Sequence, residues 1–328
     1  MKPDRARVAA SGVRRLIFIA SVFSCLISSL SGCKKNGQAS EAISSVEIWK
    51  QFSGEKAFDH TRKLVEFGPR PSGSVRLAKA RDYIAESLQQ SGWDVERQKF
   101  ADTTPRGPVE FVNLIARFPS APGNPATTDT QRVIVASHYD TKLFDTIRFV
   151  GASDGASSSG ALLEIARVLA TTPALARKIE LVFFDGEEAV QQFSETDGLY
   201  GSRFYARQLR DSKHSNQFKS GVLLDMIGDK DLTITLPPDS PPQLAQGIFA
   251  SADALAVRKY FSYLDRNILD DHVPLSSVTQ ANIPTIDVID FDYAYWHTAD
   301  DTLDKLSPES LQTVGAVTLH YLVSIWSR

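Results

Sequence analysis

The feature that most constrains this chain is a short apolar run that ends in a tight turn and two neighbouring carboxylates. The run Ile179–Phe184 predicts a buried strand. Asp185-Gly186 ends it, and Glu187 and Glu188 follow. Open α/β sheets bind ligands at the carboxyl ends of their strands, and adjacent acids repel each other unless a cation lies nearby. We interpret one glutamate as a metal ligand and the other as a proton carrier, although a solvated acidic turn would also fit these residues.

Strand-like and helical patterns alternate along the rest of the chain. Helical patterns cover residues 53–67, 78–90, 158–170, 200–209, 243–256 and 307–326, and strand patterns cover 95–100, 111–118, 133–137, 179–184, 221–227 and 283–289. A polar loop is expected between the first two strands. This alternation predicts a single-domain α/β/α sandwich, in which helices cover both faces of a mixed, mostly parallel central sheet.

The amino terminus differs in kind from the remainder. Five basic residues in positions 1–15 precede an apolar run over 16–30, which is too short to span a bilayer comfortably and predicts a secretory signal peptide. The run ends in Leu30-Ser31-Gly32-Cys33, which resembles the bacterial lipobox. That resemblance implies cleavage before Cys33 and lipidation of this residue; an ordinary signal peptide with a chance cysteine is the alternative. We therefore expect a signal peptide at 1–32, a lipidated cysteine and polar tether at 33–46, and a catalytic domain at 47–328.

Composition narrows the possible partners and chemistry. The 328 residues carry a formal net charge of -3, which gives no basic excess for binding nucleic acid. Cys25 would leave with the signal peptide and Cys33 would carry lipid, so the exported domain has no cysteine for a disulfide, a nucleophile or a metal ligand. The expected location is the bacterial cell envelope, with the outer membrane or periplasmic face favoured and the lipid on Cys33 as the membrane contact.

Three further polar residues lie where a ligand could bind. His138 ends a short strand, and Asp140 could hold the far N–H of its imidazole, although a core histidine satisfied by backbone is favoured on these residues alone. Asp154 lies among small residues at 151–158, which let backbone pack closely around a ligand, with a helix cap as the alternative. Asp225 lies within an apolar stretch, where a carboxylate is unfavourable unless it is paired or bound.

Two more candidates lie towards the carboxyl terminus. The run 268–272 combines an acidic pair with a histidine, and these residues alone favour a solvated loop. Trp296 precedes His297, and the aromatic ring would suit a pocket wall or, equally, a surface Trp–His pair. Asp154, Glu188 and His297 together form an O,O,N set that suits Zn²⁺ with one open position, as in a catalytic site. Glu187 is then free for general acid/base chemistry.

The order of these motifs resembles the M28 zinc peptidase clan. The matching segments are His138-Tyr139-Asp140, Ser153-Asp154, Phe183 to Ala189, Leu224-Asp225 and Trp296-His297-Thr298. Within that clan the chain is most similar to the glutaminyl-peptide cyclotransferases. The segments that carry this similarity are 138–142, 149–152, 183–203, 223–228 and Asp270-Asp271-His272-Val273-Pro274. The similarity extends from about Phe58 to the carboxyl terminus.

The resemblance implies an aminoacyltransferase that converts the N-terminal glutamine of peptides to pyroglutamate and releases ammonia. It implies one zinc per chain on Asp154, Glu188 and His297, with Glu187 as the general acid/base. It further implies a supporting acid pair, Asp225 and Asp270, and a substrate pocket lined by Ile268 and Trp296. Phe193 stands where the cyclases have a tryptophan, which keeps an aromatic wall but removes an indole N–H.

Two other functions fit the same residues. An M28 aminopeptidase would use His138 and Asp225 to hold a second zinc roughly 3.5–4 Å from the first, with Asp154 bridging the pair. A catalytically inactive surface-binding homologue would lack a ligand or the base. Every one of these positions carries a competent residue, so the inactive homologue ranks last.

Overall fold

The computed structural model of this protein describes residues 47–120 and 131–326. The predicted signal peptide, the lipidated Cys33 and the polar tether all lie outside these residues, so their assignment stays a prediction. Among the helices of the described residues, none has both the length and the apolar character needed to cross a membrane.

One eight-stranded mixed sheet forms the centre of the molecule, in the order β1-β2-β4-β3-β5-β8-β6-β7. The strands are β1 (Asp94–Thr104), β2 (Gly107–Arg117), β3 (Arg132–His138), β4 (Ile179–Phe184), β5 (Phe218–Asp225), β6 (Ile234–Leu236), β7 (Phe261–Tyr263) and β8 (Thr285–Ile289). The four central strands β4, β3, β5 and β8 are parallel to one another, whereas β2 joins β4 and β6 joins β8 in antiparallel fashion. The predicted mixed, mostly parallel sheet is confirmed.

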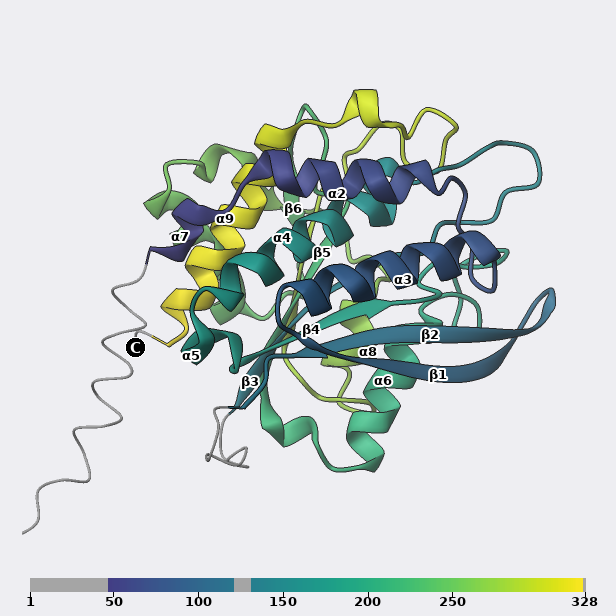
Figure 1. The fold of residues 1–328 in the computed structure, drawn as a ribbon, viewed down its shortest axis with the longest axis horizontal. Coiled ribbons are helices and arrows are strands. Elements are labelled where there is room, and N and C mark those ends of the chain that lie inside the picture. Colours follow the sequence, from purple (N-terminus) through teal and green to yellow (C-terminus); the bar gives the residue numbers. More distant parts are fainter. Residues whose placement is uncertain (1–46, 121–130, 327–328) are drawn as a thin grey trace, which may run out of the picture.

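Helices cover both faces of this sheet (Figure 1). One face carries α2 (Gly54–Glu66), α3 (Val75–Gln90), α4 (Ser158–Ala170), α5 (Pro173–Ala176), α7 (Pro242–Ala254) and α9 (Pro308–Ser324), and the other carries α6 (Tyr200–Asp211) and α8 (His272–Ser276). Short single-turn helices lie at Ile48–Gln51, Ser215–Gln217, Arg258–Tyr260 and Leu303–Lys305. The α/β/α sandwich that the alternating patterns predicted is therefore confirmed.

Local sequence explains where the main helices begin and how they pack. Ser53, Ser74 and Ser307 each cap a helix, because their side chains accept a backbone N–H three residues on. Gly160 lets α4 approach α2, since a Cβ at this position would collide with Thr61. The resulting layer of α2, α4 and α9 buries the largest apolar cluster of the described residues against the sheet.

The predicted limits of the first two strands are wrong. The polar loop expected between residues 100 and 111 is instead a continuation of β1 and β2, which pair to a turn between Thr104 and Gly107. This ribbon forms one edge of the sheet, and many of its side chains are exposed, so polar residues are accommodated. The strand pattern over 221–227 was expected to end near Asp225, and β5 does end there, where Met226 has a φ of +48° and donates its N–H to the Asp225 carboxylate at 2.8 Å.

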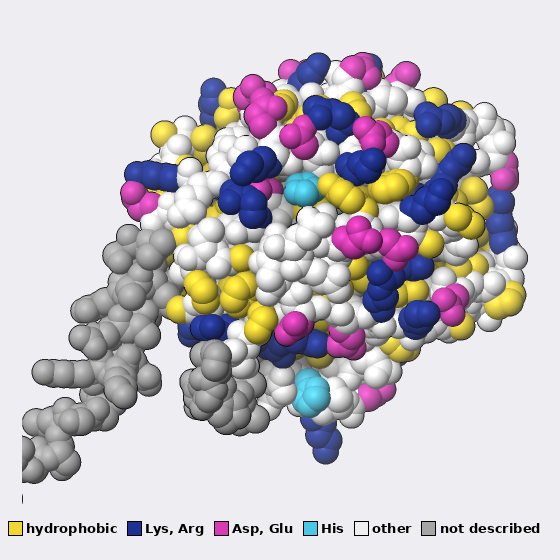
Figure 2. All heavy atoms as spheres, in the orientation of Figure 1, with side chains coloured by type: hydrophobic (Ala, Val, Ile, Leu, Met, Phe, Trp, Pro, Cys, Tyr) yellow, Lys and Arg dark blue, Asp and Glu magenta, His cyan; other side chains and the backbone are white. Residues whose placement is uncertain are grey.

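The parallel centre of the sheet determines where polar side chains gather. His138 ends β3, Asp225 ends β5, and the Glu187-Glu188 pair follows β4. All three strands point the same way, so these residues meet at one edge of the sheet. On the face seen in Figure 2, by contrast, Lys and Arg side chains are interspersed with Asp and Glu, in keeping with the small net charge.

Candidate metal centre

Asp154, Glu188 and His297 converge from three separate loops. His297 Nε2 lies 3.2 Å from Glu188 Oε2 and 3.4 Å from Asp154 Oδ2. One potential ligand atom from each residue lies within 4.8 Å of the other two. The loops follow β4, precede α4 and follow β8, so residues spread over more than 140 positions form one cluster.

The oxygen atoms of this cluster fit a bound cation. Asp154 Oδ2 and Glu188 Oε2 are buried and accept no well-formed hydrogen bond, although His297 Nε2 lies 3.4 and 3.2 Å from them. An ionised carboxylate oxygen buried without a partner is costly, and a metal ion coordinated by both would remove that cost. Two carboxylate oxygens and one imidazole nitrogen are a donor set that binds zinc and leaves a position open.

The segment around Asp154 is shaped to present this carboxylate. Asp301 accepts the backbone N–H groups of Ser153 and Asp154 at 2.7 and 3.2 Å, and Tyr293 donates its hydroxyl to the same carboxylate. Burial opposes ionisation of Asp154, but His138 and His297 outweigh it and lower the pKa of this residue. The helix-cap interpretation of Asp154 is wrong, since α4 begins without a side-chain capping bond.

A close backbone approach explains the small residues beside Asp154. Gly155 has a φ of +87°, and a Cβ there would lie 2.8 Å from both the Asp140 carbonyl oxygen and a ring carbon of His138. The Asp154 loop can therefore pack directly on the end of β3 only if this position is glycine.

The two glutamates are fixed by contacts from the β3 side. Asp140 accepts the N–H groups of Glu187 and Glu188 at 3.2 and 3.4 Å, and the N–H of Lys142 donates to Glu188 Oε1 at 3.0 Å. The turn requires glycine at 186, where φ is +74° and a Cβ would meet the Phe111 ring. Glu188 thus belongs to the metal cluster with Asp154 and His297, whereas Glu187 is not part of it.

Glu187 is a buried acid beside the cluster. Burial raises its pKa well above the ordinary value; His138 opposes this effect, and nearby carboxylates including Glu188 and Asp270 add to it. A cation bound at the cluster would lower the pKa of Glu187 and favour its ionised form. An acid in these surroundings can accept and return a proton.

A cavity of about 280 Å³ opens over this centre. Its lining includes Asp154, Glu187, Glu188, Phe193, Asp225, Ile268, Asp270, Trp296 and His297. Sequence reasoning proposed all of these as site residues, and the structure brings them together around one space. Trp296 is partly exposed, and its ring stacks on that of His297 with centroids 4.2 Å apart. It therefore forms part of the cavity wall and also supports the imidazole of His297, the candidate metal ligand.

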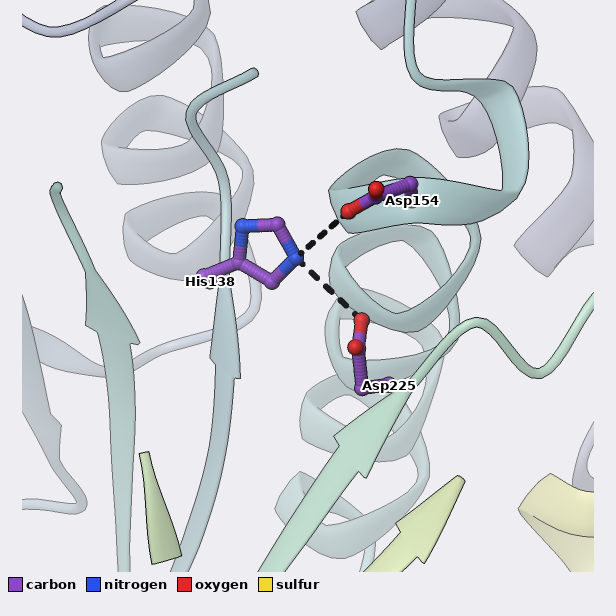
Figure 3. Close-up of side chains that lie close together, drawn as sticks. All are labelled: His138, Asp154 and Asp225. Carbon is purple, nitrogen blue, oxygen red and sulfur yellow. Dashed lines mark hydrogen bonds and ion pairs between the residues drawn. The ribbon is translucent and has the colours of Figure 1, made fainter. Parts of the chain in front are cut away.

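His138 forms a second cluster behind the first (Figure 3). Its Nε2 lies 3.2 Å from Asp154 Oδ1 and 3.2 Å from Asp225 Oδ1, and its Nδ1 lies 3.4 Å from Asp140. The backbone-satisfied core histidine favoured from sequence is therefore wrong, because the partners are carboxylates. His138 is fully buried and is not among the described residues that line the cavity.

A third cluster forms the rear of the site. Asp270, Asp271 and His272 are buried, so the solvated loop expected here is wrong. His272 Nδ1 lies 3.4 Å from Asp287, and His272 Nε2 lies 3.8 Å from Asp239. Burial opposes protonation of His272, but these acids outweigh it and raise its pKa to about 10. The imidazolium therefore compensates part of the buried negative charge.

Sequence reasoning missed the residue that joins the loops of the site. Arg70 is fully buried, and its guanidinium donates to the carbonyl oxygens of Tyr139, Val150 and Gly151 at 2.9, 2.5 and 3.0 Å. It therefore fastens the loop after β3 to the loop that carries Asp154. Burial lowers its pKa to about 10, so it remains a cation.

Comparison with known proteins decides the family. The model of peptidase family M28 matches residues 113–322 of this chain, a span that includes the whole metal cluster. The chain belongs to peptidase family M28. The family match thus confirms the clan that the order of the sequence motifs indicated.

Within this family, the relatives are mostly named for one activity. Glutaminyl-peptide cyclotransferase from Dictyostelium discoideum is 28% identical over 82% of this chain and 85% of its own length. Glutaminyl cyclase from an Acidobacteriales bacterium is 34% identical, with a TM-score of 0.74 over 84% of this chain and 95% of that one. A Zn-dependent exopeptidase from Parabacteroides distasonis is 28% identical, with a TM-score of 0.73 over 83% and 98%.

Proposed function

We propose that this protein is a zinc-dependent glutaminyl-peptide cyclotransferase. The observation that supports it is a single cavity in which an open O,O,N ligand set lies beside a buried carboxylate that takes no part in that set. The sequence relatives and structural neighbours named glutaminyl cyclases match over most of their own length and over more than four fifths of this chain.

The residues of the cavity can carry out each requirement of this reaction. A zinc ion on Asp154, Glu188 and His297 would act as a Lewis acid towards the γ-amide carbonyl of the substrate. Glu187 takes a proton from the α-amine as it attacks that carbonyl, and returns a proton to the nitrogen that leaves as ammonia. No net proton is consumed, so one carboxylate suffices.

The apolar side chains that line the cavity would orient the substrate. Phe193, Ile268 and Trp296 line the cavity and would hold the glutamine side chain curled, with its amide near its own amine. Asp225 and Asp270 line the same cavity, and burial raises the pKa of Asp225 to about 7 and that of Asp270 to about 8, so these carboxyls can hold a proton next to Glu187.

A di-zinc aminopeptidase is the second candidate, because His138, Asp154 and Asp225 form a further group with metal-ligand spacing. One feature favours the cyclotransferase. In both clusters a histidine Nε2 contacts two carboxylates at 3.2–3.4 Å, but the described lining of the cavity includes His297 and does not include His138.

Incubation with two peptides that differ only in the first residue separates the candidates. A Gln-initiated peptide should lose ammonia, and a Leu-initiated peptide should remain intact, as read by mass spectrometry. Release of free leucine would favour the aminopeptidase, and no change to either peptide would favour an inactive homologue.

We also propose export and lipid anchoring through Cys33, on the basis of the lipobox-like sequence alone. In a bacterial expression host, the full-length chain should incorporate radiolabelled palmitate and fractionate with membranes. Cys33→Ala should abolish both, and equal labelling of this variant would contradict the proposal.

A further inference from the structure

The lining of the cavity combines several acidic residues with one arginine. Five of the fifteen residues that line it are acidic, and two of these, Asp154 and Glu188, belong to the metal cluster. Arg266 is the one Lys or Arg among the described lining residues. It lies in the loop between β7 and α8, and 60% of its side chain is exposed, so it stands at the rim.

A row of aromatic contacts joins Arg266 to the metal ligand His297. Its guanidinium carbon lies 5.4 Å from the centre of the Phe291 ring. Phe291 in turn lies 5.3 Å from Trp296, which stacks on His297 at 4.2 Å. Arg–aromatic contacts of this kind hold the guanidinium plane while its N–H groups stay available for a carboxylate. The row therefore leads from the metal ligand to a cation at the rim.

The acid nearest to Arg266 does not neutralise it. Asp265 lies 2.9 Å from Arg266 Nη1, but 83% of its side chain is exposed. Ion pairs between exposed neighbours contribute little and are screened by salt. A carboxylate on a peptide already bound in the cavity would therefore compete with a weakly held neighbour for Arg266.

We propose that Arg266 selects peptides that carry a carboxylate one to three residues after the N-terminal glutamine. This inference rests on the proposed function: Phe291 and Arg266 line the same cavity as the metal cluster, so a peptide whose glutamine is bound at that cluster and whose chain leaves along these two residues would bring its next residues to Arg266. Extended peptide advances about 3.3–3.6 Å per residue, so the three ring contacts between His297 and Arg266 span a few residues. The carboxylate is an acidic side chain or the free terminus of a short peptide.

Matched peptides test this selection. Three tetrapeptide amides would carry Gln at position one and Glu, Gln or Lys at position two, with the remainder identical. For the wild type, kcat/KM should be about two- to fivefold higher for Glu than for Lys at low ionic strength, and the ratio should fall as salt is added. Arg266→Gln should bring the ratio close to one, mainly through KM, and Arg266→Lys should restore part of it.

A second readout keeps recognition separate from turnover. Calorimetric binding of the same peptides to the zinc-loaded Glu187→Gln protein, with and without Arg266→Gln, measures selection in the absence of chemistry. Arg97→Gln is the matched control, because Arg97 is a partly exposed arginine on β1 that pairs with Asp82 and does not line the cavity. It should keep the wild-type ratio.

The outcomes are distinct. Cyclisation with an equal Glu-to-Lys ratio in wild type and Arg266→Gln overturns the role of Arg266 and leaves the cyclotransferase intact. Charge-selective binding that depends on Arg266, without cyclisation of any peptide, overturns the proposed function and supports this inference. Loss of the ratio in Arg97→Gln as well would show a general charge effect and would overturn the assignment to Arg266.

Discussion

Replacement of Arg70 by lysine should destabilise the protein strongly although it conserves the charge. The guanidinium of Arg70 donates to three buried carbonyl oxygens in a fork that an ammonium group cannot reproduce. If the lysine satisfies one carbonyl, two remain without a partner, and each buried unpaired group costs about 1–3 kcal/mol. The free energy of unfolding should therefore fall by roughly 2–6 kcal/mol, a large part of the 5–15 kcal/mol of an ordinary domain.

The same substitution, Arg70→Lys, should also weaken zinc binding. One of the three carbonyls belongs to Gly151, three residues before Asp154, so a loosened loop should present this ligand less well. Urea unfolding of the metal-free protein measures the stability, and competition with a chelator measures zinc affinity. Arg62→Lys is the control, because Arg62 is exposed on α2, where it pairs with Asp59 and lies over the Phe58 ring; it should change stability by less than about 0.5 kcal/mol. A loss below about 1 kcal/mol for Arg70→Lys would refute this reasoning.

Three further changes have defined outcomes. Glu187→Gln should lower kcat by about 10²–10⁴ and leave the zinc content unchanged; near-normal turnover would exclude Glu187 as the base. Gly155→Ala, at a φ of +87° with a Cβ 2.8 Å from the Asp140 carbonyl, should lower stability by about 1–3 kcal/mol in thermal melts, and a neutral effect would show that the loop can move. Burial raises the pKa of Asp290 to about 7, so the wild-type protein loses stability from this carboxyl as pH rises from about 4 to about 7. The stability of Asp290→Asn relative to the wild type should therefore increase from pH 4 to pH 8. A difference that does not depend on pH would contradict the shift.

Much of the fold was predictable because it depends on local patterns. The apolar runs that became β3, β4 and β5 carry polar residues only where they end, and parallel strands bring such ends together. That rule, with the Glu187-Glu188 pair as an anchor, predicts a ligand site at this edge. Ligand chemistry alone suggested the set Asp154, Glu188 and His297, whereas the pairing of His138 with Asp225 needed the family resemblance.

Residues that act through backbone atoms could not be predicted. Arg70 stands in a Gly-Pro-Arg-Pro turn, and its partners are carbonyl oxygens of two distant loops, which no side-chain pattern reveals. Asp301 likewise accepts backbone N–H groups beside Asp154, so its role depends on how two loops pack.

Burial of the 268–272 run was missed for a different reason. Three consecutive polar residues suggest solvent, but α8 begins here and packs between α6 and the ends of β5 and β8. Asp287 gave a signal that could have been used: it lies within the apolar strand β8, as Asp225 does in β5, and a carboxylate in such a strand needs a partner. His272 is that partner.

Zinc stoichiometry measured against activity tests the central claim most directly. Metal-free protein would be titrated with zinc, with bound metal counted by native mass spectrometry and ammonia release from a Gln-initiated peptide followed at each point. Cyclisation should reach its maximum at one zinc per chain, and Asp154→Ala or His297→Ala should abolish both binding and turnover. Activity that appears only at two zincs per chain, with release of the N-terminal residue in place of ammonia, would contradict the account.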